Sequence, residues 1–229
     1  MLGQGSFSTV YLAEHKKLNA SCAVKCFSRT RSMRNQFLKE ADVLSYFSHP
    51  SIPKLYEKIE STEGFYLIEE YARGESLDEY VLHHEISVLF LDMVGQSLCD
   101  FFSTLLFSRK RAVFYMDMKP EHMIVTESTV KVIDYGAVLD LSGTGRDSHL
   151  FGNREYDAPE LVYDLKCRKE KAAVYSIGAI LSFLLRYAGQ DVLRKRKGIV
   201  QTATQKNPEK RYETIEALKA ALVTRTKDS

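Results

Sequence analysis

The stretch Tyr115-Met-Asp-Met-Lys-Pro-Glu-His122-Met-Ile-Val125 is followed by a polar turn and then by Val130-Lys-Val-Ile-Asp134-Tyr-Gly136. Two acids, Asp117 and Asp134, stand at the ends of short apolar runs, and core packing alone does not require this arrangement. The runs 124–125 and 130–133 indicate two short strands joined by residues 126–129. Such a hairpin holds the segment before it beside the segment after it. We therefore predict that both acids face one cleft.

This stretch resembles the catalytic loop and the metal-binding motif of eukaryotic-type serine/threonine protein kinases, which read His-Arg-Asp-Leu-Lys-Pro-x-Asn and Asp-Phe-Gly. The residues that match are Asp117, Lys119, Pro120, Asp134 and Gly136. The departures are Tyr115 for the histidine, Met116 for the arginine, His122 for the asparagine and Tyr135 for the phenylalanine.

Composition is that of a globular chain. With 229 residues, of which 45% are hydrophobic, the chain can bury a large core as one domain or two lobes. The apolar run around residues 174–185 is interrupted by polar residues and glycine, so we predict no membrane span. The four cysteines show neither pairing nor metal-ligand spacing, which favours a reducing, cytoplasmic location. The net charge of +2 gives no case for nucleic acid, and the basic run 194–197 reads as a solvated loop.

The N-terminus carries Gly3, Gly5 and Ser8 between β-forming residues, which predicts a hairpin whose tip exposes backbone N–H groups. A dinucleotide-binding fingerprint would need a strand before the first glycine and a helix after the last, and neither is indicated. The resemblance implies that Gly3, Gly5, Ser6 and Val10 cover ATP. Because almost nothing precedes Gly3, we expect that part of the first strand is missing or that the chain belongs to a longer product.

A short strand, Ala23-Val-Lys25-Cys-Phe27, has a lysine at its centre, where a charge is costly unless an acid meets it. Residues 35–46 then show a helical period that places Glu40 beside apolar residues. The resemblance implies that Ala23 lines the ATP pocket, that Glu40 pairs with Lys25, and that Lys25 holds the α- and β-phosphates. The alternative is an edge-strand charge at Lys25 and a solvated helix residue at Glu40.

Residues 65–77 resemble the fifth strand of the kinase fold and the hinge between its lobes. The resemblance implies that adenine bonds to the backbone of Glu70 and Ala72, that Ser76 or Asp78 reaches the ribose, and that Ile124 completes the pocket. Position 69, at the back of the pocket, is commonly apolar in the family. A buried Glu69 must be paired or protonated, and the sequence names no partner for it.

The C-terminal half shows amphipathic or buried helices at 87–107 and 175–187 and a last helix through Ile215, Leu218 and Leu222. Ala158-Pro-Glu160 resembles the end of the activation segment, and Arg211 is expected to pair with Glu160. Ala173 replaces the aspartate that usually holds the catalytic loop. The segment 189–205 has little room for the usual peripheral helix.

We therefore predict an α+β, bilobal protein-kinase-like fold over residues 1–229, with a β-rich N-lobe at 1–71 and a helical C-lobe at 72–229. The resemblance implies transfer of phosphate from ATP to serine or threonine hydroxyls of an unidentified protein substrate. In that scheme Asp117 orients the hydroxyl, Lys119 neutralises the γ-phosphate, and Asp134 and His122 bind the metal. His122 weakens the magnesium site, since imidazole suits softer ions such as Mn²⁺.

Two alternatives stay open. The first is a pseudokinase, a nucleotide-binding or scaffold module with little turnover, which His122, Met116, Ala173 and Glu69 favour. The second is a small-molecule phosphotransferase, whose members generally lack a Gly-rich loop together with Ala-Pro-Glu. Met116 also removes the arginine that collects an activation-loop phosphate. Activity is therefore expected not to depend on phosphate at Ser142, Thr144 or Ser148.

Overall fold

The computed structural model describes residues 1–5, 8–141, 155–162 and 165–223. Its N-terminal part is a five-stranded antiparallel sheet with strand order β1-β2-β3-β5-β4. The strands are β1 (Gly3–Gln4), β2 (Ser8–His15), β3 (Ala20–Ser28), β4 (Leu55–Glu60) and β5 (Gly64–Glu70). Phe65, Leu67 and Glu69 of β5 are buried in alternation, which is the period of a strand whose one face is covered.

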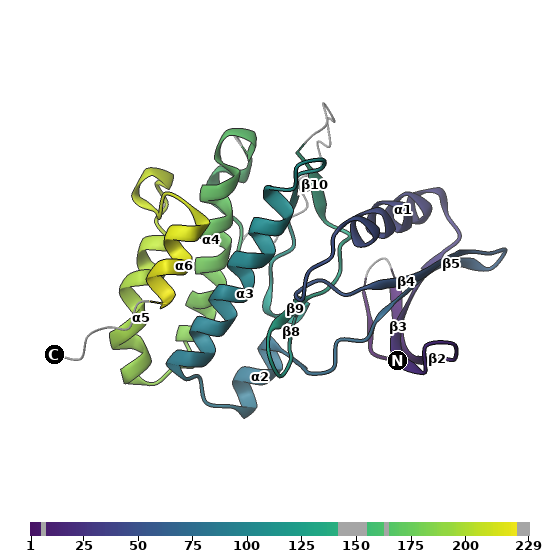
Figure 1. The fold of residues 1–229 in the computed structure, drawn as a ribbon, viewed down its shortest axis with the longest axis horizontal. Coiled ribbons are helices and arrows are strands. Elements are labelled where there is room, and N and C mark those ends of the chain that lie inside the picture. The colour runs from purple at the N-terminus through teal and green to yellow at the C-terminus, as the bar shows by residue number, and fades with distance from the viewer. Residues whose placement is uncertain (6–7, 142–154, 163–164, 224–229) are drawn as a thin grey trace.

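Helix α1 (Arg31–Tyr46) lies against the sheet (Figure 1). It begins four residues before the expected start at Asn35, because Thr30 caps it: the Thr30 hydroxyl accepts from the backbone N of Met33 at 3.2 Å. The side of α1 that faces the sheet contributes Phe37, whose ring stacks on Phe65 at 5.4 Å between centroids. This packing fixes Glu40, one turn further along, over the middle of the sheet.

Helices make up most of the C-terminal part (Figure 1). They are α2 (Leu77–His83), α3 (Val88–Leu106), α4 (Leu165–Leu185), α5 (Gln190–Ala203) and α6 (Ile215–Val223), with short 3₁₀ turns at Pro120–His122, Pro159–Val162 and Pro208–Lys210. The expected helices at 87–107 and after 215 are confirmed. The one at 175–187 belongs to α4, which starts ten residues earlier in a polar stretch with no apolar period.

Helix α3 is the centre of the C-lobe core. Ten of its residues are buried, and α4 and α6 pack against it. At Gly95 a Cβ atom would lie 2.5 Å from Leu222 Cδ1, so glycine permits the close approach of α6. Among the described residues, α3 is the helix whose length and hydropathy would suffice to cross a membrane, and half of that stretch is buried inside the protein. Helix α3 is therefore a helix of the protein core.

Residues 189–205 contain a helix, so the expectation of too little room was wrong. Val192, Val200 and Ala203 lie on the buried side of α5, but the apolar period is interrupted by Arg196. Arg196 is only 3% exposed, and its guanidinium donates two bonds of 2.7 Å to Asp92 of α3. The basic run is therefore not a solvated loop, because one of its members is a buried ion-pair partner.

Small sheets join the two parts. The strands β8 (Met123–Val125) and β9 (Val130–Val132) form the predicted hairpin, with Val125 opposite Val130, and β6 (Glu75–Ser76) pairs with β8. The strands β7 (Val113–Tyr115) and β10 (Val138–Asp140) pair beside them. Figure 1 places this region between the sheet and the helices. A β-rich N-lobe with one main helix and a helical C-lobe is the α+β, bilobal arrangement that was predicted.

Candidate active site

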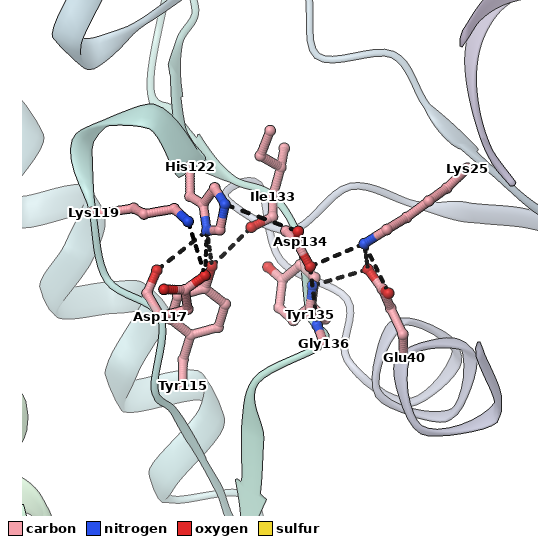
Figure 2. Close-up of polar contacts among 10 residues, drawn as sticks. All are labelled: Lys25, Glu40, Tyr115, Asp117, Lys119, His122, Ile133, Asp134, Tyr135 and Gly136. Atoms are coloured by element: carbon pink, nitrogen blue, oxygen red, sulfur yellow. Dashed lines mark hydrogen bonds and ion pairs between the residues drawn. The ribbon is translucent and has the colours of Figure 1, made fainter. Parts of the chain in front are cut away.

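Lys25 lies at the centre of a cluster of acids (Figure 2). Its Nζ donates to Glu40 Oε1 at 2.6 Å, to Glu40 Oε2 at 2.9 Å and to Asp134 Oδ1 at 2.9 Å. Lys25 comes from β3, an inner strand of the sheet, and Glu40 comes from α1. Lys25 is 7% exposed and Glu40 is 0% exposed. The alternative of an edge-strand lysine and a solvated glutamate is therefore excluded.

The Lys25 ammonium interacts with several carboxyl groups, and the pKa values of these groups are shifted in different directions. Burial alone would lower the pKa of Lys25, but Glu40, Asp134 and Glu69 raise it. Burial alone would raise the pKa of Asp134, yet the Lys25 ammonium lowers it. Burial and the charge of Glu40 raise the pKa of Glu69 to about 8. Glu69 is therefore mainly protonated at neutral pH. Of the two possibilities for a buried Glu69, a paired or a protonated carboxyl group, the second applies.

The backbone at Asp134 is in the left-handed region, with φ at 64°, a conformation that costs energy for a residue with a side chain. Two bonds hold it there. The backbone N of Gly136 donates to Asp134 Oδ1 at 3.2 Å, and the backbone N of Tyr135 donates to Glu40 Oε1 at 3.0 Å. Glu40 thus binds both Lys25 and the turn that carries Asp134 (Figure 2).

Asp117 lies across the same cleft, as predicted (Figure 2). Its Oδ2 lies 3.2 Å from Lys119 Nζ and 3.2 Å from His122 Nδ1. The carboxylate is 27% exposed, so a substrate can reach it while its neighbours fix its orientation. A carboxylate with an adjacent ammonium can position a hydroxyl group and balance the charge of a transferring phosphate.

Tyr115 connects the two acidic segments, a role that the sequence reasoning did not identify. Its hydroxyl donates to the backbone O of Ile133 at 2.8 Å and lies 3.2 Å from His122 Nδ1. The side chain is completely buried, and its ring meets that of Tyr135 edge-on at 5.6 Å. The buried polar side chain just before Asp117 was the available signal, because a buried hydroxyl requires a partner.

Asp134 and His122 were the predicted metal ligands, and the geometry fits that role in part. His122 Nε2 lies 3.9 Å from Asp134 Oδ2, a separation that one ion with bonds of about 2.1 Å can bridge. Burial lowers the pKa of His122 although Asp134 and Asp117 oppose this, and burial thus favours the neutral imidazole, the form that can bind a metal ion. Among the described residues, no group of three or more His, Cys, Asp or Glu forms a complete metal site. A bound ion would therefore need phosphate or water oxygens as further ligands.

The residues predicted to bind the nucleotide come from the N-terminal sheet, from the segment after β5 and from β8. Gly3 of β1 is opposite Val10 of β2, which forms the expected Gly-rich hairpin, and Ser6 lies outside the described residues. Val10 of β2 lies opposite Lys25 of β3, so the Gly-rich hairpin is directly bonded to the strand that carries the lysine. The other residues that were predicted to contact the nucleotide are half-buried: Val10, Ala23, Glu70, Ala72, Ser76 and Ile124.

The connection between the lobes begins where β5 ends. Gly74 lies so near β8 that a Cβ atom would be 1.8 Å from the carbonyl O of Val125, so only glycine fits there. The Glu70 side chain binds Lys131 Nζ of β9 at 3.1 Å, which ties the hinge to the hairpin. Ser76 is opposite Ile124 in the β6–β8 pair, so these two predicted pocket residues are neighbours.

The predicted pair of Glu160 and Arg211 is also present. Arg211 Nη2 donates to Glu160 Oε2 at 2.8 Å, and Arg211 Nη1 donates to Glu160 Oε1. The hydroxyl residues of the activation segment, Ser142, Thr144 and Ser148, lie outside the described residues. A cavity of about 820 Å³ between α3, α5 and α6 includes none of the predicted site residues.

Comparison with known proteins agrees with this geometry. The family described as protein kinase domain matches residues 1–224. Mouse sperm motility kinase 3A is 28% identical over 80% of this chain, rice CBL-interacting protein kinase 5 is 30% identical over 81%, and Arabidopsis CBL-interacting serine/threonine-protein kinase 2 is 28% identical over 81%. The chain covers 36%, 41% and 42% of the length of these mouse, rice and Arabidopsis relatives, respectively. With the family matched over almost its whole length, this chain belongs to the protein kinase family.

Proposed function

We propose that this chain transfers the γ-phosphate of ATP to serine or threonine hydroxyls of protein substrates. One observation carries the proposal: Lys25 is bonded to both Glu40 and Asp134, and Asp117 with Lys119 lies across the same cleft. Phosphoryl transfer needs cations placed around the phosphates and a carboxylate at the acceptor hydroxyl, and these residue types serve that chemistry.

Each residue has one role in this scheme. Lys25, fixed by Glu40, binds the α- and β-phosphates, and Lys119 balances charge on the γ-phosphate. Asp117 accepts a hydrogen bond from the substrate hydroxyl and orients it for attack. Asp134 and His122 hold the divalent ion, Mg²⁺ or Mn²⁺, which neutralises phosphate charge when bound. The backbone of Glu70 and Ala72 binds the adenine, while Gly3, Gly5, Ser6, Val10, Ala23, Ser76 and Ile124 enclose the nucleotide.

Serine and threonine as acceptors are supported by Lys119, two residues after Asp117, and by the similarity to the Arabidopsis serine/threonine-protein kinase. Asn153 stands where that branch of the family usually has threonine, and it lies outside the described residues. The protein substrate is left open.

A pseudokinase is the second candidate, and one contact favours it. His122 Nδ1 lies 3.2 Å from Asp117 Oδ2, where it competes with the substrate hydroxyl for that oxygen. Ala173, completely buried in α4, offers no carboxylate to the catalytic loop. In this reading the chain binds nucleotide but turns it over slowly.

Transfer of ³²P from γ-labelled ATP to a serine/threonine peptide library, with Mg²⁺ and with Mn²⁺, tests the proposal. The wild type should label peptides, and Asp117→Asn should lose at least about a hundredfold in rate, within the range of general-base effects. Asp191→Asn is the matched control, because Asp191 lies on the exposed side of α5 and pairs there with Arg194 and Lys195. No labelling by the wild type would favour the pseudokinase, whereas equal labelling by the wild type and Asp117→Asn would show that Asp117 does not have the proposed role.

A further inference from the structure

Two buried polar atoms of the cleft lack hydrogen-bond partners among the described residues: Glu69 Oε1 and Tyr135 Oη. Glu69 is 8% exposed and Tyr135 is 0% exposed. A buried polar atom without a partner is uncommon, because it has lost its bonds to water without replacement. Neither residue has a part in the proposed phosphoryl transfer.

Glu69 lies on the face of the sheet that carries Lys25. It is opposite Ala23, and the next inward-facing pair is Lys25 with Leu67. The side chain therefore projects toward α1 and the Asp134 turn, beside the ion pair but without a bond to it. The charged groups around it are Lys25 on β3, Glu40 on α1 and Asp134.

Tyr135 approaches the same place from the other lobe. Its ring packs against Tyr115 at 5.6 Å and Phe101 at 6.5 Å, so the side chain is held firmly. Burial raises the pKa of its hydroxyl, and the charges of Glu69 and Glu40 raise it further. The backbone N of Tyr135 bonds to Glu40, and Glu40 also binds Lys25 on the sheet face that carries Glu69. Both residues are therefore neighbours of the Lys25–Glu40 pair, and no direct bond joins their side chains.

We propose that a buried water molecule links the Glu69 carboxyl to the Tyr135 hydroxyl and that this link positions Asp134. Buried waters typically bridge polar groups that have no other partner. The backbone of Tyr135 is already fixed by Glu40, so a bond at its hydroxyl would anchor both ends of the residue that follows Asp134. Glu69 and Tyr135 act as positioning residues, and their effect on metal binding rests on the proposed function.

The link itself is tested without any ligand, by a double-mutant cycle on urea unfolding of the full chain. Glu69→Met and Tyr135→Phe each leave the other group without its partner, so each should lower the folded-to-unfolded ratio by about tenfold. The double variant should be no less stable than either single one. As a control, Ser176→Ala removes a buried unpartnered hydroxyl in α4 and should combine additively with Tyr135→Phe. Additive effects of Glu69→Met and Tyr135→Phe would overturn the link.

The positioning role is tested by ATP affinity with and without Mg²⁺, measured by calorimetry. Measured against its own metal-free affinity, each single variant should lose at least about fivefold of the gain that the metal gives. Glu69→Gln should retain that gain, because an amide can still bond to water. An undiminished gain in both single variants would overturn the positioning role. If the wild type shows no gain, the proposed function fails together with that role, and the unfolding cycle still decides the link.

Discussion

In the proposed function, His122 is the residue that we expect to determine which ion the site prefers. Mg²⁺ favours oxygen ligands, whereas an imidazole nitrogen suits Mn²⁺ and other softer ions. His122 Nε2 faces Asp134 Oδ2 at 3.9 Å, while Nδ1 faces Asp117, so the ring stands between the metal-binding and the hydroxyl-binding carboxylates. We therefore expect the identity of this residue to affect both metal binding and orientation of the substrate hydroxyl in the proposed reaction.

We predict that the wild type is faster with Mn²⁺ than with Mg²⁺ and that His122→Asn raises the Mg²⁺-supported rate by about tenfold, as ligand-sphere changes can. The reason is that an amide oxygen replaces the imidazole and frees Asp117. Turnover against metal identity measures this. A wild type that works as well with Mg²⁺ and is unaffected by His122→Asn would contradict it.

Glu69 gives the stability of the protein a dependence on pH. Its pKa is about 8 in the folded protein, against an ordinary value of 4.5 in the unfolded chain. Between these values the folded state binds a proton that the unfolded state has released, so stability falls as pH rises from about 4.5 to 8. Glu69→Gln removes this titration. Urea unfolding at pH 6 and pH 8 should show the wild type losing up to about 1.4 kcal/mol per pH unit relative to the variant. Parallel pH profiles would show that Glu69 is already ionised.

Among the elements, α5 depends on one buried ion pair. Arg196 and Asp92 are both buried and joined by two bonds of 2.7 Å, so removing one partner leaves an uncompensated charge. We predict that Arg196→Met lowers the free energy of unfolding by about 3–5 kcal/mol and that adding Asp92→Leu recovers most of the loss. Arg194→Met, on the exposed side of α5, should cost about 1 kcal/mol or less. Thermal and urea unfolding distinguish these outcomes, and a small effect of Arg196→Met would refute the prediction.

The elements that the sequence predicted well are those with a local signal. The β8–β9 hairpin, α1 and α3 follow from apolar period and turn chemistry, and the meeting of Asp117, Asp134, Lys25 and Glu40 follows from recognised motifs. Helix α5 was missed because Arg196 interrupts its apolar face, and its partner Asp92 is 104 residues away. The Tyr115 bond to Ile133 and the packing of Tyr135 against Tyr115 and Phe101 were missed for the same reason, since a local sequence pattern does not reveal contacts between segments that are distant in the chain.

At the scale of the whole molecule, the site is built only where the two lobes meet. Lys25 and Glu40 come from the N-lobe and Asp134 comes from the C-lobe, while Glu70 and Lys131 bridge the lobes beside the hinge. A change in lobe closure would therefore alter the Lys25–Asp134 contact.

A cytoplasmic location stays a prediction.

The measurement that tests the account most directly is calorimetry of ATP binding with and without Mg²⁺, comparing the wild type with Asp134→Ala. We predict that the metal tightens ATP binding to the wild type by about tenfold or more and that Asp134→Ala abolishes this gain, because Asp134 supplies the charged ligand. Binding that ignores the metal, or that Asp134→Ala leaves unchanged, would contradict the account and make the cluster around Lys25 a structural element of a pseudokinase.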